Sequence, residues 1–184
     1  MIYPWYETLN HSNEIRQGDL ILDCPIIIPP TNFNYIETQD AQIPNAGEVV
    51  VRTMNSVVVT QSCDLENDIV ENVLVCPYYT WSQFVAAMPT SDQTANGRKR
   101  KWDELRKGNL PSYHLINKDE DVGLEDYLVV DFRNVFGVNY PFLRTFAENI
   151  PTRQRLLPPY REHLSQSFAR FFMRVGLPID IELQ

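Results

Sequence analysis

Short runs of β-branched residues constrain the fold of this chain more than any other feature. Val57-Val58-Val59 is the clearest run, and three consecutive valines favour extended backbone and leave no polar face. The pattern predicts a buried strand over residues 56–60. Leu20–Cys24 and Val73–Pro77 predict two more strands. We therefore expect a mainly β fold built from short strands.

Turn-forming residues and prolines predict where these strands end. Asn55-Ser56 is expected to form a turn before the valine strand, and Pro77 is expected to end the strand that precedes it. The triple isoleucine inside Pro25–Pro44 predicts an edge strand or an extended segment. Two late strands are expected, within Leu110–Ile116 and Tyr127–Phe132.

Helices are expected between the strands. Thr80 is placed to cap a short helix over Trp81–Met88, and Arg98–Lys107 predicts a second helix that Gly108 would end. Phe142–Glu148 is expected to form a helical turn. The aromatic residues of Tyr3–Asn10 are expected to pack as an arm or a short helix.

The last helix is expected over about 159–175 and is amphipathic. Pro158-Pro159 suits its first position. Its apolar stripe is more often core than interface, but its phenylalanines are dense and a basic stripe lies beside them. This helix is therefore the candidate partner-binding surface, through Phe168, Phe171, Phe172, Arg170 and Arg174.

The net charge of −8 restricts contact with nucleic acid to local surfaces. Arg98–Lys107 carries six basic and two acidic residues, so the rest of the chain sums to −12. With Trp102 interleaved, this helix is a candidate nucleic-acid contact through Arg98, Lys99, Arg100 and Lys101. Two alternatives stay open: a solvated helix docked by its apolar residues, or an electrostatic contact with an acidic partner.

Three widely spaced cysteines, Cys24, Cys63 and Cys76, predict neither a disulfide framework nor a zinc site. We expect a reducing, cytoplasmic location, with no signal peptide, no membrane-spanning segment, and neither metal nor cofactor.

The order of these elements resembles the PemK/MazF-like toxins, whose fold is a small SH3-like barrel with a C-terminal helix. The matching pieces are Gln17–Leu22, the valine strand, Val73–Pro77, Leu124–Arg133 and Arg153–Leu156 before the terminal helix. The length of 184 residues predicts a single domain over 1–184, and the resemblance implies its architecture. Its mainly β, PemK-like barrel core would span about 14–135, with inserted helices over about 80–108 and the C-terminal amphipathic helix outside it.

The chain departs from that family where the family usually carries Arg-Pro before the valine strand. Here that place is Met54-Asn55-Ser56, and Arg52 lies four residues upstream of Ser56. The segment Thr60–Asp64 also resembles a Ser-Gln-Thr/Ser-Cys-Asp signature of uncharacterised bacterial proteins, some of them in phage-defence neighbourhoods. The missing cationic motif counts against ribonuclease activity.

The polar residues after the valine strand form the candidate catalytic site. If the chain cleaves RNA, Thr60, Ser62 and Asp64 would supply proton-transfer groups, with Arg52 or Arg16 as the cation near the phosphate. The alternative is a strand-ending turn whose side chains bind local backbone N–H groups. Cys63 in the same turn would need a histidine to act as a nucleophile. Its acidic neighbour disfavours the thiolate, so a structural thiol is the preferred interpretation.

The first functional hypothesis is a non-catalytic protein-interaction or regulatory subunit of a bacterial defence or toxin–antitoxin-type system. It would bind another protein of that system through the Pro25–Pro44 loop and the terminal helix. The alternatives are a PemK/MazF-like RNA endonuclease and a nucleic-acid-binding accessory protein. The oligomeric state is left open.

Overall fold

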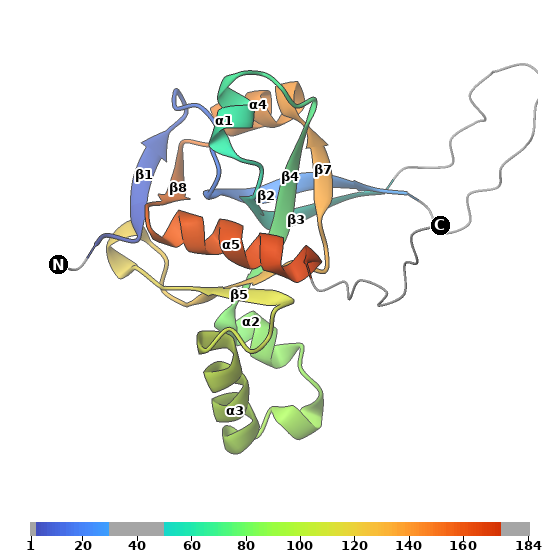
Figure 1. The fold of residues 1–184 in the computed structure, drawn as a ribbon, viewed down its shortest axis with the longest axis vertical. Helices are drawn as coiled ribbons and strands as arrows, with labels where there is room; N and C mark the ends of the chain where they lie inside the picture. Colours follow the sequence, from blue (N-terminus) through green and yellow to red (C-terminus); the bar gives the residue numbers. More distant parts are fainter. Residues whose placement is uncertain (1–2, 30–49, 174–184) are drawn as a thin grey trace, which may run out of the picture.

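The computed structural model describes residues 3–29 and 50–173, where eight strands form one antiparallel sheet (Figure 1). The strand order is β1-β8-β2-β3-β4-β6-β5, and β7 pairs with β4 beside that path. The strands are β1 (Tyr6–Asn10), β2 (Asp19–Ile28), β3 (Val50–Val58), β4 (Asn72–Thr80), β5 (Tyr113–Ile116), β6 (Leu128–Asp131), β7 (Phe136–Asn139) and β8 (Thr152–Leu156).

Five α-helices and two short 3-10 helices accompany the sheet in these ranges. They are α1 (Ser62–Glu66), α2 (Trp81–Ala86), η1 (Thr90–Asp92), α3 (Ala95–Arg106), η2 (Glu120–Val122), α4 (Tyr140–Glu148) and α5 (Tyr160–Phe172). None of the described helices is long and apolar enough to cross a bilayer.

The expected mainly β class is confirmed, but a closed barrel is not. Within the described ranges the two ends of the strand path, β1 and β5, share no backbone pairing. A side chain joins them instead, because the Tyr6 hydroxyl donates a hydrogen bond to the carbonyl oxygen of Asn117, just after β5. The sheet therefore brings its ends together without closing.

Two predicted strand ends are wrong. β3 runs straight through Asn55-Ser56, and the Asn55 side chain accepts a hydrogen bond from the N–H of Asp23 on the neighbouring strand. Asp23 has φ of +48° at an irregularity in β2. The Asn55 side chain therefore stabilises a bulge in the neighbouring strand instead of forming a turn in its own. β4 likewise continues beyond Pro77. That proline lies where the strand leaves β3 and pairs next with β6.

Other elements also differ from expectation. The aromatic arm forms strand β1, which pairs with β8, and the polar turn after the valine strand contains the short helix α1. The triple isoleucine lies in β2, whereas the remainder of the Pro25–Pro44 segment lies outside the described residues beyond Pro29. The terminal helix begins one residue after Pro159. Arg174 also lies outside the described residues.

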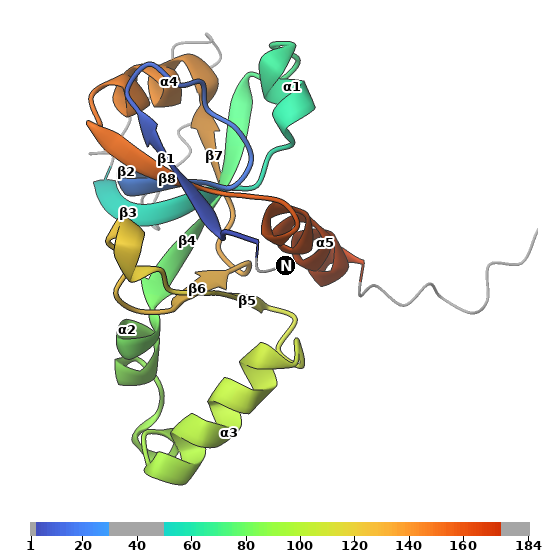
Figure 2. The same ribbon diagram turned by 90° about the vertical axis from the view of Figure 1, so that its left-hand side faces the viewer.

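Helices are found in the segment expected to form the helical insertion, and α2 and α3 project from one end of the sheet, beyond β5 and β6 (Figures 1 and 2). Thr80 and Gln83 form a reciprocal capping box at the start of α2, which satisfies two backbone N–H groups. Gly108 follows α3 with φ of +68°, as expected for a residue that ends a helix in left-handed backbone.

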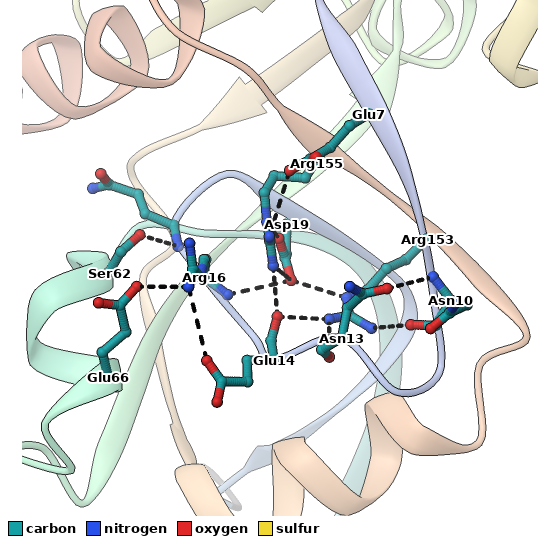
Figure 3. A network of polar contacts seen from close by, with 11 residues as sticks. Glu7, Asn10, Asn13, Glu14, Arg16, Asp19, Ser62, Glu66, Arg153 and Arg155 are labelled. Carbon is teal, nitrogen blue, oxygen red and sulfur yellow. Dashed lines mark hydrogen bonds and ion pairs between the residues drawn. The ribbon is translucent and has the colours of Figure 1, made fainter.

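A buried charge cluster fastens β1, β2 and β8 together (Figure 3). Asp19 is fully buried at the start of β2, and its carboxylate pairs with the guanidinium groups of Arg153 and Arg155 on β8. The Arg153 Nε–Asp19 Oδ2 distance is 2.9 Å. Both arginines also donate to the carbonyl oxygen of Glu14. Arg155 also pairs with Glu7 of β1 at 3.5 Å, so two carboxylates balance the two guanidinium charges. The arginine N–H groups also hold the loop before β2.

Removing the shared carboxylate should destabilise the fold strongly. Asp19→Ala leaves two buried guanidinium groups facing each other, which we expect to cost about 3–5 kcal/mol of unfolding free energy. Urea unfolding followed by tryptophan fluorescence would measure it. Glu66→Ala is the matched control, because it breaks the exposed Arg16–Glu66 pair and should cost at most about 1 kcal/mol. Equal losses in the two variants would contradict this assignment.

Candidate functional site

The expected catalytic residues are not gathered into one centre. Arg52 lies exposed on the outer part of β3, opposite Ile26. It is six residues from Val58, which is about 20 Å along a strand. Thr60 and Ser62 lie beyond that end. The structure therefore separates Arg52 from the turn that it was expected to serve.

The hydroxyl groups of the Thr60–Asp64 segment are used in structural contacts. The Thr60 hydroxyl accepts a hydrogen bond from the Leu74 N–H at 2.7 Å, and the Ser62 hydroxyl accepts one from the Gln17 N–H at 3.2 Å. Arg16 does reach α1, but its guanidinium pairs with Glu66 at 3.0 Å (Figure 3). Both hydroxyls therefore accept hydrogen bonds from backbone N–H groups of other segments, Leu74 and Gln17, rather than from neighbours within the turn.

Cys63 has polar neighbours but no catalytic partner among its contacts in the described residues. Its exposed thiol lies 3.6 Å from Gln61 Oε1 and 3.5 Å from Asp64 Oδ1. Within the ranges that the structure describes, no group of three His, Cys, Asp or Glu residues could hold a metal ion.

The phenylalanines of α5 divide into core and surface. Phe168 and Phe171 pack against the buried ring of Phe132, with ring centroids 5.5 and 6.2 Å away. Phe172 is 54% exposed at the end of the helix. Two of the five expected partner-binding residues, Phe168 and Phe171, are therefore partly buried against the core, whereas Phe172 and Arg170 are exposed.

The expected basic patch on α3 is largely occupied with local contacts. Arg98 donates to the Gln93 carbonyl oxygen, Arg100 pairs with Asp92, and Lys101 pairs with Glu104. These contacts hold the helical insertion together. The other end of α3, with Arg106 and Lys107, lines a cleft, and Arg106 also lies 3.6 Å from the carboxylate of Asp103.

That cleft lies between α3, β5 and α5, and we name it the α3–α5 cleft. Its volume is about 570 Å³, within the range of ligand-binding pockets. His163, Ser167 and Arg170, three members of the polar stripe on α5, line the wall opposite α3. The cleft thus joins two surfaces that the sequence presents as separate candidates.

Aromatic rings supply much of the remaining lining. Trp5, before β1, stacks on Tyr160 at the start of α5, with ring centroids 3.5 Å apart and planes 8° from parallel. The rings of Trp102 on α3 and Tyr127 pack edge to face, with centroids 4.6 Å apart. Neither Trp5 nor Tyr160 was singled out from the sequence. Pairing of the first strand with the last, which no local pattern shows, brings them together.

The charge of the lining is of one sign. Arg106, Lys107 and Arg170 carry fixed positive charge, and none of the described lining residues is Asp or Glu. Because the chain carries −8 in total, the residues outside the cleft sum to −11. An acid-free, positive cleft in so acidic a chain favours an anionic ligand.

His114 on β5 faces the same cleft near His163. Burial, with a smaller contribution from the charge of His163, lowers the pKa of His114 to about 4. His114 therefore carries no charge at neutral pH, and the fixed charge of the cleft comes from its arginines and lysine.

Comparison with protein-family models, with curated proteins and with solved structures gives no match to this chain.

The lowered pKa of His114 makes stability depend on pH. Between about pH 6.5 and pH 4 the unfolded chain binds a proton on His114 that the folded chain does not, so acidification should destabilise the fold. Between about pH 6.5 and pH 4 the unfolding free energy of the wild type should fall by on the order of 2–3 kcal/mol more than that of His114→Gln. Urea unfolding of both proteins at several pH values measures the difference. Parallel stability profiles would contradict the assignment.

Proposed function

We propose that this chain is a non-catalytic binding protein that holds an acidic segment of a partner protein in the α3–α5 cleft. It would act as an interaction or regulatory subunit of a bacterial defence or toxin–antitoxin-type system. The observation that carries this proposal is the acid-free lining, with three fixed cations, in a chain of net charge −8.

The lining residues are of the kinds that dominate protein interfaces. Trp, Tyr and Arg are enriched among the residues whose truncation costs most binding energy, and this cleft contains Trp5, Tyr160 and Arg170 among others. Aromatic rings would cover the apolar part of a partner segment, while the cations on α3 and α5 pair with its carboxylates. A long polyanion is disfavoured, because the residues outside the cleft lining carry a formal charge that sums to −11.

The structural use of the Thr60 and Ser62 hydroxyls supports the non-catalytic part of the proposal. Each hydroxyl already accepts a backbone N–H, and the nearest cation, Arg16, is paired with Glu66. A ribonuclease needs a free base and acid near an available cation.

One observation favours nucleic-acid binding as a second candidate. The stacked Trp5–Tyr160 pair borders the cleft, and aromatic side chains at such sites stack on unpaired bases. A short single strand would therefore compete with an acidic segment for the same surface.

We also infer that the sheet is an opened, diverged form of the SH3-like barrel. The approach of β1 to β5 through Tyr6 and Asn117 supports this relation. A cytoplasmic location belongs to the same proposal, since the three cysteines are free thiols.

Reversing the charge of the cleft should abolish partner binding. We expect Arg106→Glu with Arg170→Glu to lose a stoichiometric, acidic partner protein that the tagged wild type retains when purified from its native host. Quantitative mass spectrometry of the purified material measures the loss.

The matched control is Lys99→Glu with Arg52→Glu, two exposed residues outside the cleft lining. It changes the net charge by the same amount, so it should retain the partner. Equal retention by both double variants would refute the cleft as the binding surface. Recovery that nuclease treatment abolishes would favour the second candidate.

A further inference from the structure

A second cavity lies where the helical insertion meets the sheet, and we name it the Arg133 cavity. Its volume is about 510 Å³. Phe84 and Met88 line it from α2 and the residues after it, while Tyr79 and Tyr113 line it from the sheet. Asp92 and Lys101 also line it, and each is paired with a residue outside the lining, Arg100 and Glu104 respectively. A pocket that combines apolar side chains with a few converging polar groups is the usual form of a small-molecule site.

Strand register explains why its polar groups converge. Tyr113 pairs with Asp131, and Tyr79 pairs with Val129, two residues before Asp131 on β6. Side chains two apart on a strand share a face, so both tyrosines and Asp131 lie on one face of the β4–β6–β5 part of the sheet. The insertion covers that face.

Arg133 is held in a fixed position at this cavity. Its Nε and Nη2 lie 2.9 and 2.7 Å from the two carboxylate oxygens of Asp131, and its guanidinium lies 4.8 Å from the centroid of the Tyr113 ring. The carboxylate is almost fully buried, whereas the Arg133 side chain is 55% exposed. The Asp131 carboxylate also accepts hydrogen bonds from the backbone N–H of Arg133 and from the side-chain amide of Asn134.

This arrangement presents a cation to the cavity and hides the anion that balances it. The Asp131 oxygens are occupied by four donors, so a ligand meets the outer N–H groups of Arg133 rather than the carboxylate. A fork of N–H donors held in this way suits a carboxylate, which it can bind with two parallel hydrogen bonds. A purely structural ion pair would gain nothing from opening onto an apolar pocket.

We propose that the Arg133 cavity binds a small organic carboxylate with an aromatic or apolar body. The carboxylate would pair with Arg133 beside the hydroxyl groups of Tyr79 and Tyr113, and the body would lie against Phe84 and Met88. This site is separate from the α3–α5 cleft, although Tyr113 lines both, and the proposal does not depend on the function proposed for that cleft.

Three probes of matched shape test it: phenylacetate, phenethylamine and benzyl alcohol. Trp81 stacks near Phe84, with ring centroids 5.9 Å apart, so tryptophan fluorescence reports on the cavity, and calorimetry gives the affinity. We expect saturable binding of phenylacetate and weaker or no binding of the other two. Arg133→Gln should lower the affinity for phenylacetate about tenfold or more. Arg133→Lys should retain part of that affinity.

Arg144→Gln is the matched control. Arg144 also pairs with a carboxylate, Asp68, and also lies over a tyrosine ring, that of Tyr140, but it does not line this cavity. Its replacement should leave phenylacetate binding unchanged. Arg133→Gln leaves the buried carboxylate of Asp131 without its ion-pair partner, so it could also disturb the fold. Ala87→Phe is therefore a second variant, because it fills the cavity and leaves the ion pair intact. It should abolish phenylacetate binding.

The proposal is overturned if phenylacetate and phenethylamine bind equally, or if phenylacetate fails to bind up to its solubility limit. Unchanged binding in folded Ala87→Phe would also overturn it.

Discussion

The buried carboxylate of Asp19 imposes the constraint on which the rest of the sheet depends. Two guanidinium groups from β8 can be buried because Asp19 lies between them, Glu7 pairs with Arg155, and backbone carbonyl oxygens accept hydrogen bonds from their other N–H groups. The cluster fixes β8 between the first two strands and so places Trp5 beside Tyr160. A charge cluster at one end of the sheet thereby sets one wall of the α3–α5 cleft.

The change of partner along β4 has an equally wide effect. Up to Pro77 the strand pairs with β3 and β7, and from Tyr78 it pairs with β6. Pro77 destabilises the sheet little, because its missing N–H lies where the pairing with β3 ends and the pairing with β6 begins. The strands beyond that point form a small two-sided sheet. One face packs toward α5 and the core, and the other carries Asp131 and Tyr113 toward the helical insertion.

Sequence patterns predicted what depends on neighbours along the chain. The valine strand, the Thr80 cap and the Gly108 helix end are local, and each was found. The failures are tertiary. Asn55 forms no turn because its side chain supports a bulge on another strand. β8 is polar in sequence because its arginines pair with two acids, Asp19 and Glu7, that lie more than 130 residues away. Both candidate sites are likewise assembled from distant segments, so no spacing in the sequence could have placed them together.

The two sites differ in how they make a positive surface, and this difference separates their ligands. In the α3–α5 cleft no described lining residue is an acid, and Asp103, outside the lining, forms an exposed pair with Arg106. The positive field is therefore spread over several exposed cations and suits a flexible acidic segment. In the Arg133 cavity one guanidinium is fixed by a buried partner, so the charge is local and its direction is set. A fixed fork discriminates by geometry rather than by charge alone. One molecule thus presents an electrostatic surface for a partner and, beside it, a shaped pocket for a small anion, and Tyr113 is the wall that they share.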